Sequence, residues 1–337
     1  MDLLKKLCET NAVSGNEFNV ASVIENYLKT FSDNIFRDGM GNIVAEIGNR
    51  GKVRIMLEAH IDQIGLVVKS IDENGFVKFI KSGGINSSIL PTAEVVIHGK
   101  KDIYGVIGAK PPHLQTEKDK KLSDSENMYI DCGYSFDEIK KYVDIGDTIS
   151  LSAQFSELKN GNISSKSLDN RIGVYVVAKC LEELAAKNLP YKLAGVFSVQ
   201  EEVGCRGSVT AAERLNPDYA VVVDVTFGVS PYTTKEDGFE TGKGITVAVG
   251  PNLDRETAAK FIELCKGESI KFEKEVCAAN TGTDAWPIQV AADGVKCVLV
   301  SVPVKYMHTT VETASRDDIS SAVCAIVKAI EGGVFDA

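Results

Sequence analysis

The chain has 337 residues, of which 44% are apolar and 25% charged, an ordinary balance for a globular protein with a large core. Lys and Arg number 37 and Asp and Glu number 47, so the net charge is −10, which argues against nucleic acid or an anionic membrane as partner. No apolar run reaches the roughly 18–20 residues of a membrane span, and the N-terminus lacks a signal-peptide pattern, so we expect a cytoplasmic protein.

The first stretch, up to about residue 65, predicts helices followed by two buried strands. After a short N-terminal helix, apolar residues recur at helical spacing in NEFNVASVIENYLKTF, residues 16–31. GNIVAEIG (41–48) and KVRIMLEAH (52–60) are apolar runs of the kind found in buried strands. The second run ends on His60, one of only four histidines, and Asp62 follows one residue later.

Residues 68–163 show a different pattern, in which short strands follow one another. GLVVKSI, GFVKFIKSGG, EVVIHG, IYGVIG and DTISLSAQF are strand-like runs separated by glycine-bearing turns, with few helix signals. This pattern predicts a small β-rich unit inserted into the chain.

From residue 164 onward, apolar strands alternate with amphipathic helices. Helices are expected over 170–189, 208–215, 254–267 and 315–333, and Asp254 is a plausible N-cap of the third. Strands are expected in YKLAGVFSVQEE, YAVVVDVT and GVKCVLVSVP. The sequence therefore predicts an α/β fold, a sheet with helices on both faces, formed by residues 1–67 and 164–337 and interrupted by residues 68–163.

Some chemically versatile residues have ordinary structural explanations. The eight cysteines form no C-x-x-C pair, and several lie in apolar patterns, so we expect reduced core cysteines. His98 and His113 are expected to be hydrogen-bonded polar groups rather than ligands.

Titratable residues gather where the strands of the α/β part end. In open α/β sheets, ligands bind beyond the carboxyl ends of the strands. His60 with Asp62, the pair Glu201 and Glu202, Asp224, and His308 follow such strands, and Asp169 stands in the turn before a long helix.

Two histidines with several carboxylates form a hard N/O ligand set, which suits Zn²⁺, Co²⁺ or Mn²⁺. The set exceeds what one catalytic zinc would take, which hints at two metals that share a carboxylate. The chain contains no G-x-S-x-G, H-E-x-x-H or G-x-x-x-x-G-K-[ST] motif that would indicate another chemistry.

At this point the sequence resembles the M42 family of metallo-aminopeptidases, which includes tetrahedral, deblocking and glutamyl aminopeptidases. The resemblance covers nearly the whole chain. It rests on seven stretches in the family's order and spacing: EAHIDQIG, GVIGAKPPH, SLDNRIG, VQEEVGCRG, VVVDVT, NTGTDA and KYMHTTVE. As a set these stretches are highly specific, although each one alone would be weak.

The resemblance implies a role for each residue at the strand ends. His60 and Asp224 would hold one metal ion, Glu202 and His308 a second, and Asp169 would bridge them. Glu201 would be the general base and acid, not a ligand, and Asp62 would orient His60 from behind.

The implied activity is release of the N-terminal residue from short peptides, with two divalent cations per subunit, zinc or cobalt and also manganese. The family's insertion is PDZ-like and serves assembly, and members form dimers and self-compartmentalising dodecamers. The chain departs from many members in the stretch FGVSPYTTKEDG after VVVDVT, so the substrate specificity of the family cannot be transferred to it. It also has Gln63 where some members have glutamate.

Three other functions stay open. A related metal-dependent deacylase or carboxypeptidase would share the metal geometry. An endoglucanase, a label this family has carried, would need two carboxylates and no metal, and the chain has one tryptophan with which to build a sugar platform. A peptide-binding scaffold is disfavoured because all seven catalytic-type positions are present.

Overall fold

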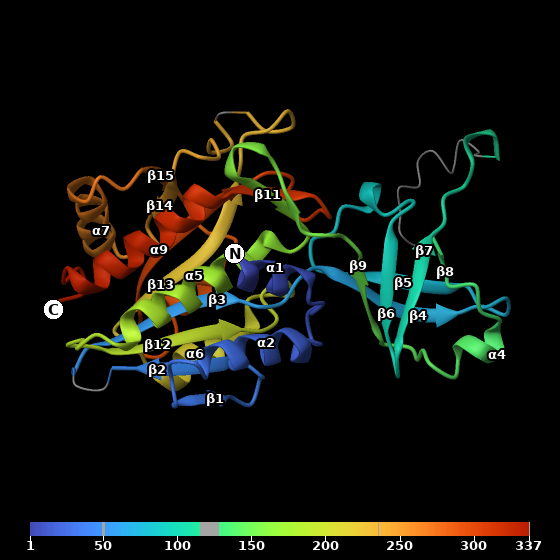
Figure 1. The fold of residues 1–337 in the computed structure, drawn as a ribbon, viewed down its shortest axis with the longest axis horizontal. Coiled ribbons are helices and arrows are strands. Elements are labelled where there is room, and N and C mark those ends of the chain that lie inside the picture. The colour runs from blue at the N-terminus through green and yellow to red at the C-terminus, as the bar shows by residue number, and fades with distance from the viewer. Residues whose placement is uncertain (49–50, 115–127, 235, 337) are drawn as a thin grey trace.

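The protein consists of a larger α/β part, which contains both termini, and a smaller β part that projects from it (Figure 1). The computed structural model describes residues 1–48, 51–114, 128–234 and 236–336.

The larger part is built on an eight-stranded mixed sheet. The four central strands run parallel, whereas antiparallel pairings attach the strands on either side of them. The order across the sheet is β1 (Ile35–Arg37), β2 (Ile43–Ile47), β12 (Lys192–Ser198), β3 (Arg54–His60), β13 (Tyr219–Phe227), β16 (Lys296–Val304), β14 (Ile245–Val249) and β15 (Phe272–Val276).

Helices cover both faces of this sheet, as the sequence predicts. Successive residues of a strand point to opposite faces, so Val221 and Val223 of β13 join one core and Ala220 and Val222 the other. The first core packs against α1 (Asp2–Glu9), α2 (Phe18–Leu28), α5 (Leu168–Ala185), α7 (Arg255–Gly267) and α9 (Arg316–Glu331). The second packs against α6 (Arg206–Leu215) and α8 (Ala285–Ile288). In the part of the chain that the structure describes, no helix is both long and apolar enough to cross a membrane.

Local signals explain where individual elements begin. The Asp254 carboxylate accepts a hydrogen bond from the Thr257 N–H, so the predicted N-cap of α7 is confirmed. All eight cysteines are free, as expected from their spacing, and half of them are buried.

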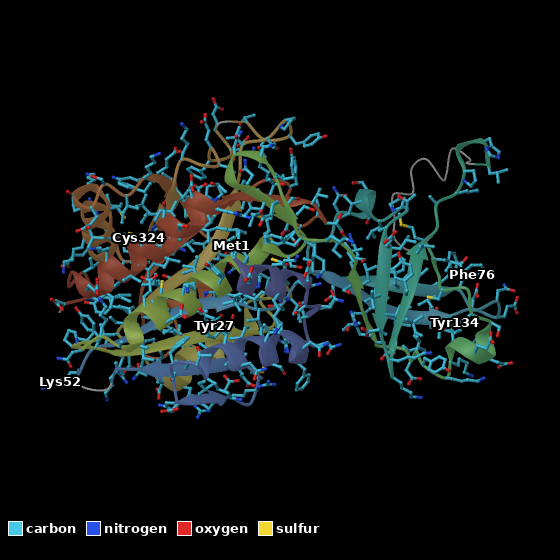
Figure 2. All side chains as sticks on the ribbon, viewed as in Figure 1. Met1, Tyr27, Lys52, Phe76, Tyr134 and Cys324 are labelled. Carbon is cyan, nitrogen blue, oxygen red and sulfur yellow. The ribbon has the colours of Figure 1, made fainter. Side chains whose placement is uncertain are left out.

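The smaller part is a closed six-stranded barrel with its own apolar core. Its strands, in order around the barrel, are β4 (Gly65–Ile71), β5 (Val77–Ser82), β8 (Ile130–Asp131), β7 (Asp102–Ile107), β6 (Glu94–His98) and β9 (Thr148–Leu151). The short helices η1 (Ser87–Ile89), η2 (Pro112–Leu114) and α4 (Phe136–Ile139) connect them. His98 bonds to Asp102 and Ser150, which confirms its structural role. Phe76 and Tyr134 mark the end of the barrel that lies away from the larger part (Figure 2).

A three-stranded sheet connects the end of the inserted region to the C-terminal part of the chain. It consists of β10 (Ser156–Glu157), β11 (Asn162–Ser165) and β17 (Glu312–Ser315), with η4 (Lys159–Gly161) between the first two. β11 pairs antiparallel with β17. This pairing brings the segment just before α5 next to the segment that follows β16.

Candidate active site

The candidate site lies at the carboxyl edge of the central parallel strands. β3 ends on His60, and Asp224 lies near the end of β13. The expected strand over residues 191–202 ends earlier, at Ser198, so the prediction that it runs to Glu201 and Glu202 was wrong. Beyond the strand end, Gln200 adopts a positive φ of 60°, and the two glutamates lie in the following loop.

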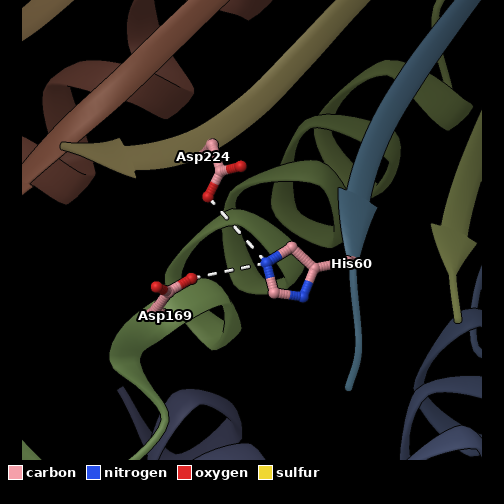
Figure 3. Close-up of side chains that lie close together, drawn as sticks. All are labelled: His60, Asp169 and Asp224. Carbon is pink, nitrogen blue, oxygen red and sulfur yellow. Dashed lines mark ion pairs between the residues drawn. The ribbon is translucent and has the colours of Figure 1, made fainter. Parts of the chain in front are cut away.

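The first group of candidate metal ligands lies around the His60 ring (Figure 3). His60 Nε2 lies 3.3 Å from Asp169 Oδ1 and 4.0 Å from Asp224 Oδ1. Asp169 comes from the start of α5, so three elements that are distant in sequence supply the three side chains. All three are buried.

A second group shares Asp169 with the first. His308 Nε2 lies 3.2 Å from Asp169 Oδ2 and 3.6 Å from Glu202 Oε2. The two carboxylate oxygens of Asp169 therefore face two different histidines. Asp169 is the one residue common to both groups of candidate ligands.

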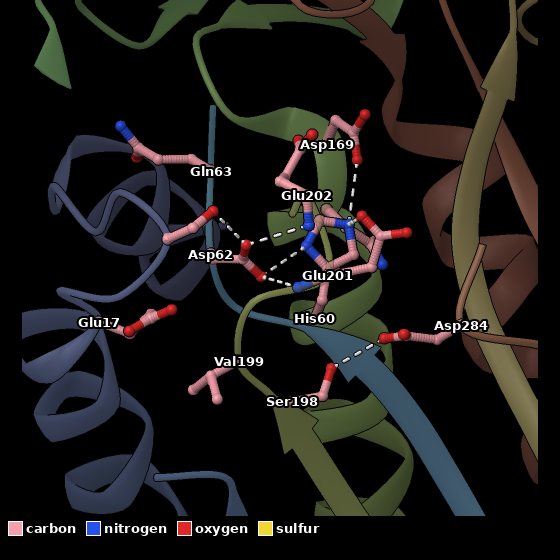
Figure 4. A network of polar contacts seen from close by, with 12 residues as sticks. Glu17, His60, Asp62, Gln63, Asp169, Ser198, Val199, Glu201, Glu202 and Asp284 are labelled. Carbon is pink, nitrogen blue, oxygen red and sulfur yellow. Dashed lines mark hydrogen bonds and ion pairs between the residues drawn. The ribbon is translucent and has the colours of Figure 1, made fainter. Parts of the chain in front are cut away.

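Asp62 holds together the segments that carry these side chains (Figure 4). Its Oδ1 lies 3.4 Å from His60 Nδ1 and accepts the Glu201 N–H at 3.0 Å, while its Oδ2 accepts the Glu202 N–H at 3.2 Å. The Ser14 hydroxyl donates a further hydrogen bond to Oδ2 at 2.6 Å. The intervening Ile61 points into the apolar core, as the alternation of side chains along an extended chain predicts.

Glu312, to which sequence reasoning assigned no role, connects Asp169 with His308. Its buried carboxylate accepts the Asp169 N–H at 3.0 Å through Oε2 and the His308 N–H at 2.8 Å through Oε1. Its presence in KYMHTTVE was the only sequence signal that could have identified it.

The barrel reaches the site through two glycines that follow β5. The Gly84 carbonyl oxygen lies 3.2 Å from His308 Nδ1. A Cβ added at Gly84 would lie 2.6 Å from the same nitrogen, and one added at Gly83 would lie 3.3 Å from Glu202 Oε2. Only glycine therefore lets the barrel approach the histidine and the glutamate this closely.

A third cluster lies behind Glu201. The Cys205 thiol donates to Glu201 Oε1 at 3.2 Å, and the buried Asp284 carboxylate accepts hydrogen bonds from Ser198 and Ser208. Candidate ligand atoms of Glu201, Cys205 and Asp284 lie within 4.8 Å of one another. Burial and the nearby Asp284 and Glu201 carboxylates raise the pKa of the Cys205 thiol, so it stays protonated as a donor.

The electrostatics of the site reflect an excess of buried acid. Burial raises the pKa of Glu201 to about 7, although the nearby His60 opposes the shift. Burial and the negative charge of Asp169 together raise the pKa of Glu202. Burial opposes the charge of His308, yet Asp169 and Glu202 outweigh it and raise its pKa to about 10. Five carboxylates face two imidazoles here, and among the described residues no Lys or Arg forms an ion pair with any of the five.

This donor set fits divalent cations. Ligand atoms about 2.0–2.2 Å from one tetrahedral ion lie roughly 3.3–3.6 Å apart. The distances from Asp169 to both histidines and from Glu202 to His308 are close to this range, and the His60–Asp224 distance of 4.0 Å is longer. Cations would also offset the excess of carboxylate charge. An α/β sheet with such a donor set at its carboxyl edge is the arrangement found in metal-dependent hydrolases.

Comparison with known proteins identifies the family. Residues 41–324 match the family described as M42 glutamyl aminopeptidase. A putative aminopeptidase of Acetivibrio thermocellus is 36% identical over 98% of both chains. The lysyl aminopeptidase of Pyrococcus furiosus is 31% identical over 96% of this chain and 94% of its own.

Solved structures agree. A TET aminopeptidase from a marine-sediment Thaumarchaeota archaeon superposes with a TM-score of 0.92 at 28% identity, over 98% of this chain and 96% of its own. The TET1 peptidase of Pyrococcus horikoshii can assemble into a tetrahedron or a large octahedral shell. It superposes with a TM-score of 0.87 at 32% identity, over 98% of both chains. The chain belongs to the M42 family and is a hydrolase with aminopeptidase function.

Proposed function

We propose that the protein is a metal-dependent aminopeptidase that uses two divalent cations per subunit to remove N-terminal residues from short peptides. The observation that carries this proposal is the position of Asp169, whose two oxygens face His60 and His308 at 3.3 and 3.2 Å. One carboxylate between two ligand groups is the arrangement of two-metal hydrolytic sites.

The ligand assignment follows the two groups. His60 and Asp224 would hold one cation, Glu202 and His308 the other, and Asp169 would bridge them. Each cation would then have three protein ligands, which leaves positions free for a water and for the substrate amine. Zinc or cobalt fits this N/O set, and manganese is an alternative.

The residues of the chain divide the remaining work. When bound, the cations would supply Lewis acidity that polarises the scissile carbonyl and acidifies a water. Glu201 would accept the proton of the attacking water and return it to the leaving amine, a task that suits a carboxyl pKa raised to about 7. Asp62 would fix the His60 ring and the Glu201 backbone.

We propose that the chain has two domains: a discontinuous catalytic domain, residues 1–67 and 164–337, and an inserted domain, residues 68–163. The inserted domain contains the barrel and would be the unit through which subunits assemble. Its strands form a core separate from that of the larger sheet. A relative assembles into closed shells, which supports self-association here, between dimer and dodecamer. A PDZ-like character of the insertion is part of the same proposal.

We place the protein in the cytoplasm. All eight cysteines are free, although several are only partly buried, which suits a reducing compartment.

The test compares free with N-acetylated peptides, before and after metal removal. Chelation should abolish cleavage, and Zn²⁺, Co²⁺ or Mn²⁺ should restore it for free peptides only. Equal cleavage of acetylated peptides would favour the deacylase or an endopeptidase. Activity on polysaccharide that chelators leave unchanged would favour the endoglucanase instead.

A further inference from the structure

Among the described residues, Glu275 is a carboxylate without a positively charged partner. Glu275 of β15 accepts hydrogen bonds from the Thr226 hydroxyl at 2.8 Å and from the Thr246 hydroxyl at 2.7 Å. The two threonines come from β13 and β14, so three strands together fix the orientation of this carboxylate. Among the described residues, no Lys, Arg or His forms an ion pair with it.

This carboxylate lies on the face of the sheet that carries Asp224. Thr226 follows Asp224 by two residues in a regularly paired strand, so the two side chains share a face about 7 Å apart. The register runs from Asp224 to Ser301 of β16 and from Ser301 to Thr246, so Thr246 shares that face too.

The chain that leaves Glu275 returns to the site. Residues 277–284 connect β15 to α8, and Asp284 at the end of this connection lies beside Glu201 (Figure 4). Its carboxylate approaches Glu201 and Cys205 within 4.8 Å. The segment that begins at Glu275 therefore ends at Asp284, next to Glu201, the proposed general base.

The chemistry favours one kind of ligand group. Glu275 is partly exposed and oriented by neutral donors, and none of the residues that the structure describes neutralises it, so a cation can approach it without displacing an ion pair seen here. A lysine side chain reaches roughly 6 Å from its Cα, close to the Asp224–Thr226 spacing. An acidic side chain at the same place would be repelled.

We propose that Glu275 recognises the side chain of the first substrate residue and makes lysine and arginine preferred over neutral and acidic residues. This inference rests on the proposed function, because the substrate amine must be held near Asp224 for that side chain to reach Glu275. The preference concerns the chemistry of the first side chain and not the reaction itself.

The test measures kcat/KM of the metal-loaded enzyme on p-nitroanilides of lysine, arginine, norleucine, leucine and glutamate. Norleucine has nearly the length of lysine without its charge. We expect lysine to exceed norleucine by about tenfold and glutamate to be the poorest substrate. In Glu275→Gln the lysine advantage should disappear, while norleucine and leucine change by less than about twofold.

The matched control is Glu273→Gln, which removes one negative charge from an exposed position on the same strand. It should keep the lysine advantage, because a general field effect is not what we propose. Equal losses for lysine and norleucine in Glu275→Gln would overturn the inference, as would a wild-type enzyme without lysine preference.

Two outcomes separate this inference from the proposed function. An enzyme that cleaves leucine anilide but shows no lysine advantage contradicts the role of Glu275 alone. An enzyme that cleaves none of the anilides after metal loading contradicts the aminopeptidase proposal itself. If Glu275→Gln fails to fold by thermal melting, the wild-type lysine-to-norleucine ratio and the Glu275→Asp variant decide the matter.

Discussion

His60 is a buried imidazole with an acid beside each ring nitrogen. Asp62 lies 3.4 Å from Nδ1, while Asp169 and Glu201 lie 3.3 and 3.8 Å from Nε2. Burial opposes the charge of the ring, but the carboxylates outweigh it and raise its pKa. In the proposed enzyme Nε2 would face a cation instead, and Asp62 would keep Nδ1 as the protonated nitrogen.

Glu201 offers the sharpest single substitution. We predict that Glu201→Gln lowers kcat by about 10²–10⁴-fold, because the amide cannot accept the proton of the attacking water. Metal content should stay at the wild-type level, since Glu201 is not a proposed ligand. Elemental analysis of the purified variant checks this, and loss of metal would show that Glu201 is a ligand after all.

Gln63 is a buried, uncharged side chain that lies between two buried cations, Lys166 and Arg171. Its Oε1 accepts from Lys166 Nζ at 3.2 Å, from the Ser167 hydroxyl at 2.9 Å and from Arg171 Nη2 at 3.4 Å. Burial and the Arg171 charge lower the pKa of Lys166 to about 7. The folded state therefore binds fewer protons than the unfolded chain between about pH 7 and 10.5, and stability rises with pH there.

We predict that Gln63→Glu increases the free energy of unfolding by about 1–3 kcal/mol at pH 7, because a carboxylate bonds the two cations more strongly than an amide. The gain should shrink towards pH 10, because Lys166 loses its buried charge in the wild-type protein, whereas the added carboxylate keeps Lys166 protonated in the variant. Urea titrations at pH 7 and 10 measure both effects. An unchanged or lower stability at pH 7 would contradict the prediction.

Glu312 connects two secondary-structure elements, because its carboxylate bonds the start of α5 and the turn between β16 and β17. We predict that Glu312→Gln weakens metal binding by about 10–100-fold, since one of the two buried N–H groups loses its acceptor. Isothermal titration with Zn²⁺ measures the affinity. Glu157→Gln, an exposed change in the same three-stranded sheet, is the control and should bind normally.

The helices and strands of the α/β part could be predicted because apolar periodicity and caps are local. α1, α2 and the N-cap of α7 follow directly from sequence. The end of β12 could not be predicted, because contacts distant in sequence hold the residues that follow it. Asn42 accepts the Val199 N–H across 157 residues, and Asp62 accepts the Glu201 N–H across 139. Glu312 and Gly84 were missed for the same reason, since Glu312 contacts Asp169 and Gly84 contacts His308 across long stretches of sequence.

The candidate site was predictable in part. Acids and histidines after apolar strands predict that they converge, and the structure brings them together at one edge. Their pairing into two groups around Asp169 came from the family resemblance, because strand order is not visible in a single sequence.

At the scale of the whole molecule, the barrel presents an apolar outer surface. Tyr104 and Val106 are 54% and 42% exposed on β7, and alternate residues of that strand fill the barrel core. We predict that the protein is an oligomer and that Tyr104→Lys with Val106→Lys shifts it to smaller species. Light scattering after gel filtration measures the mass. The control is Tyr232→Lys, at a position of the larger part that is 86% exposed, and it should leave the mass of the oligomer unchanged. A wild-type protein that is monomeric at micromolar concentration would contradict the assembly proposal.

The central claim is that two cations share Asp169, and metal stoichiometry tests it most directly. Equilibrium dialysis against Zn²⁺ followed by elemental analysis should give two ions per subunit for the wild-type protein. Asp169→Asn should lose metal affinity at both positions, because a neutral amide bridges poorly and does not offset two dications. The control, Asp102→Asn in the barrel, should still bind two ions per subunit. Saturation of the wild-type protein at one ion, or an Asp169→Asn variant that keeps both ions at wild-type affinity, would contradict the account.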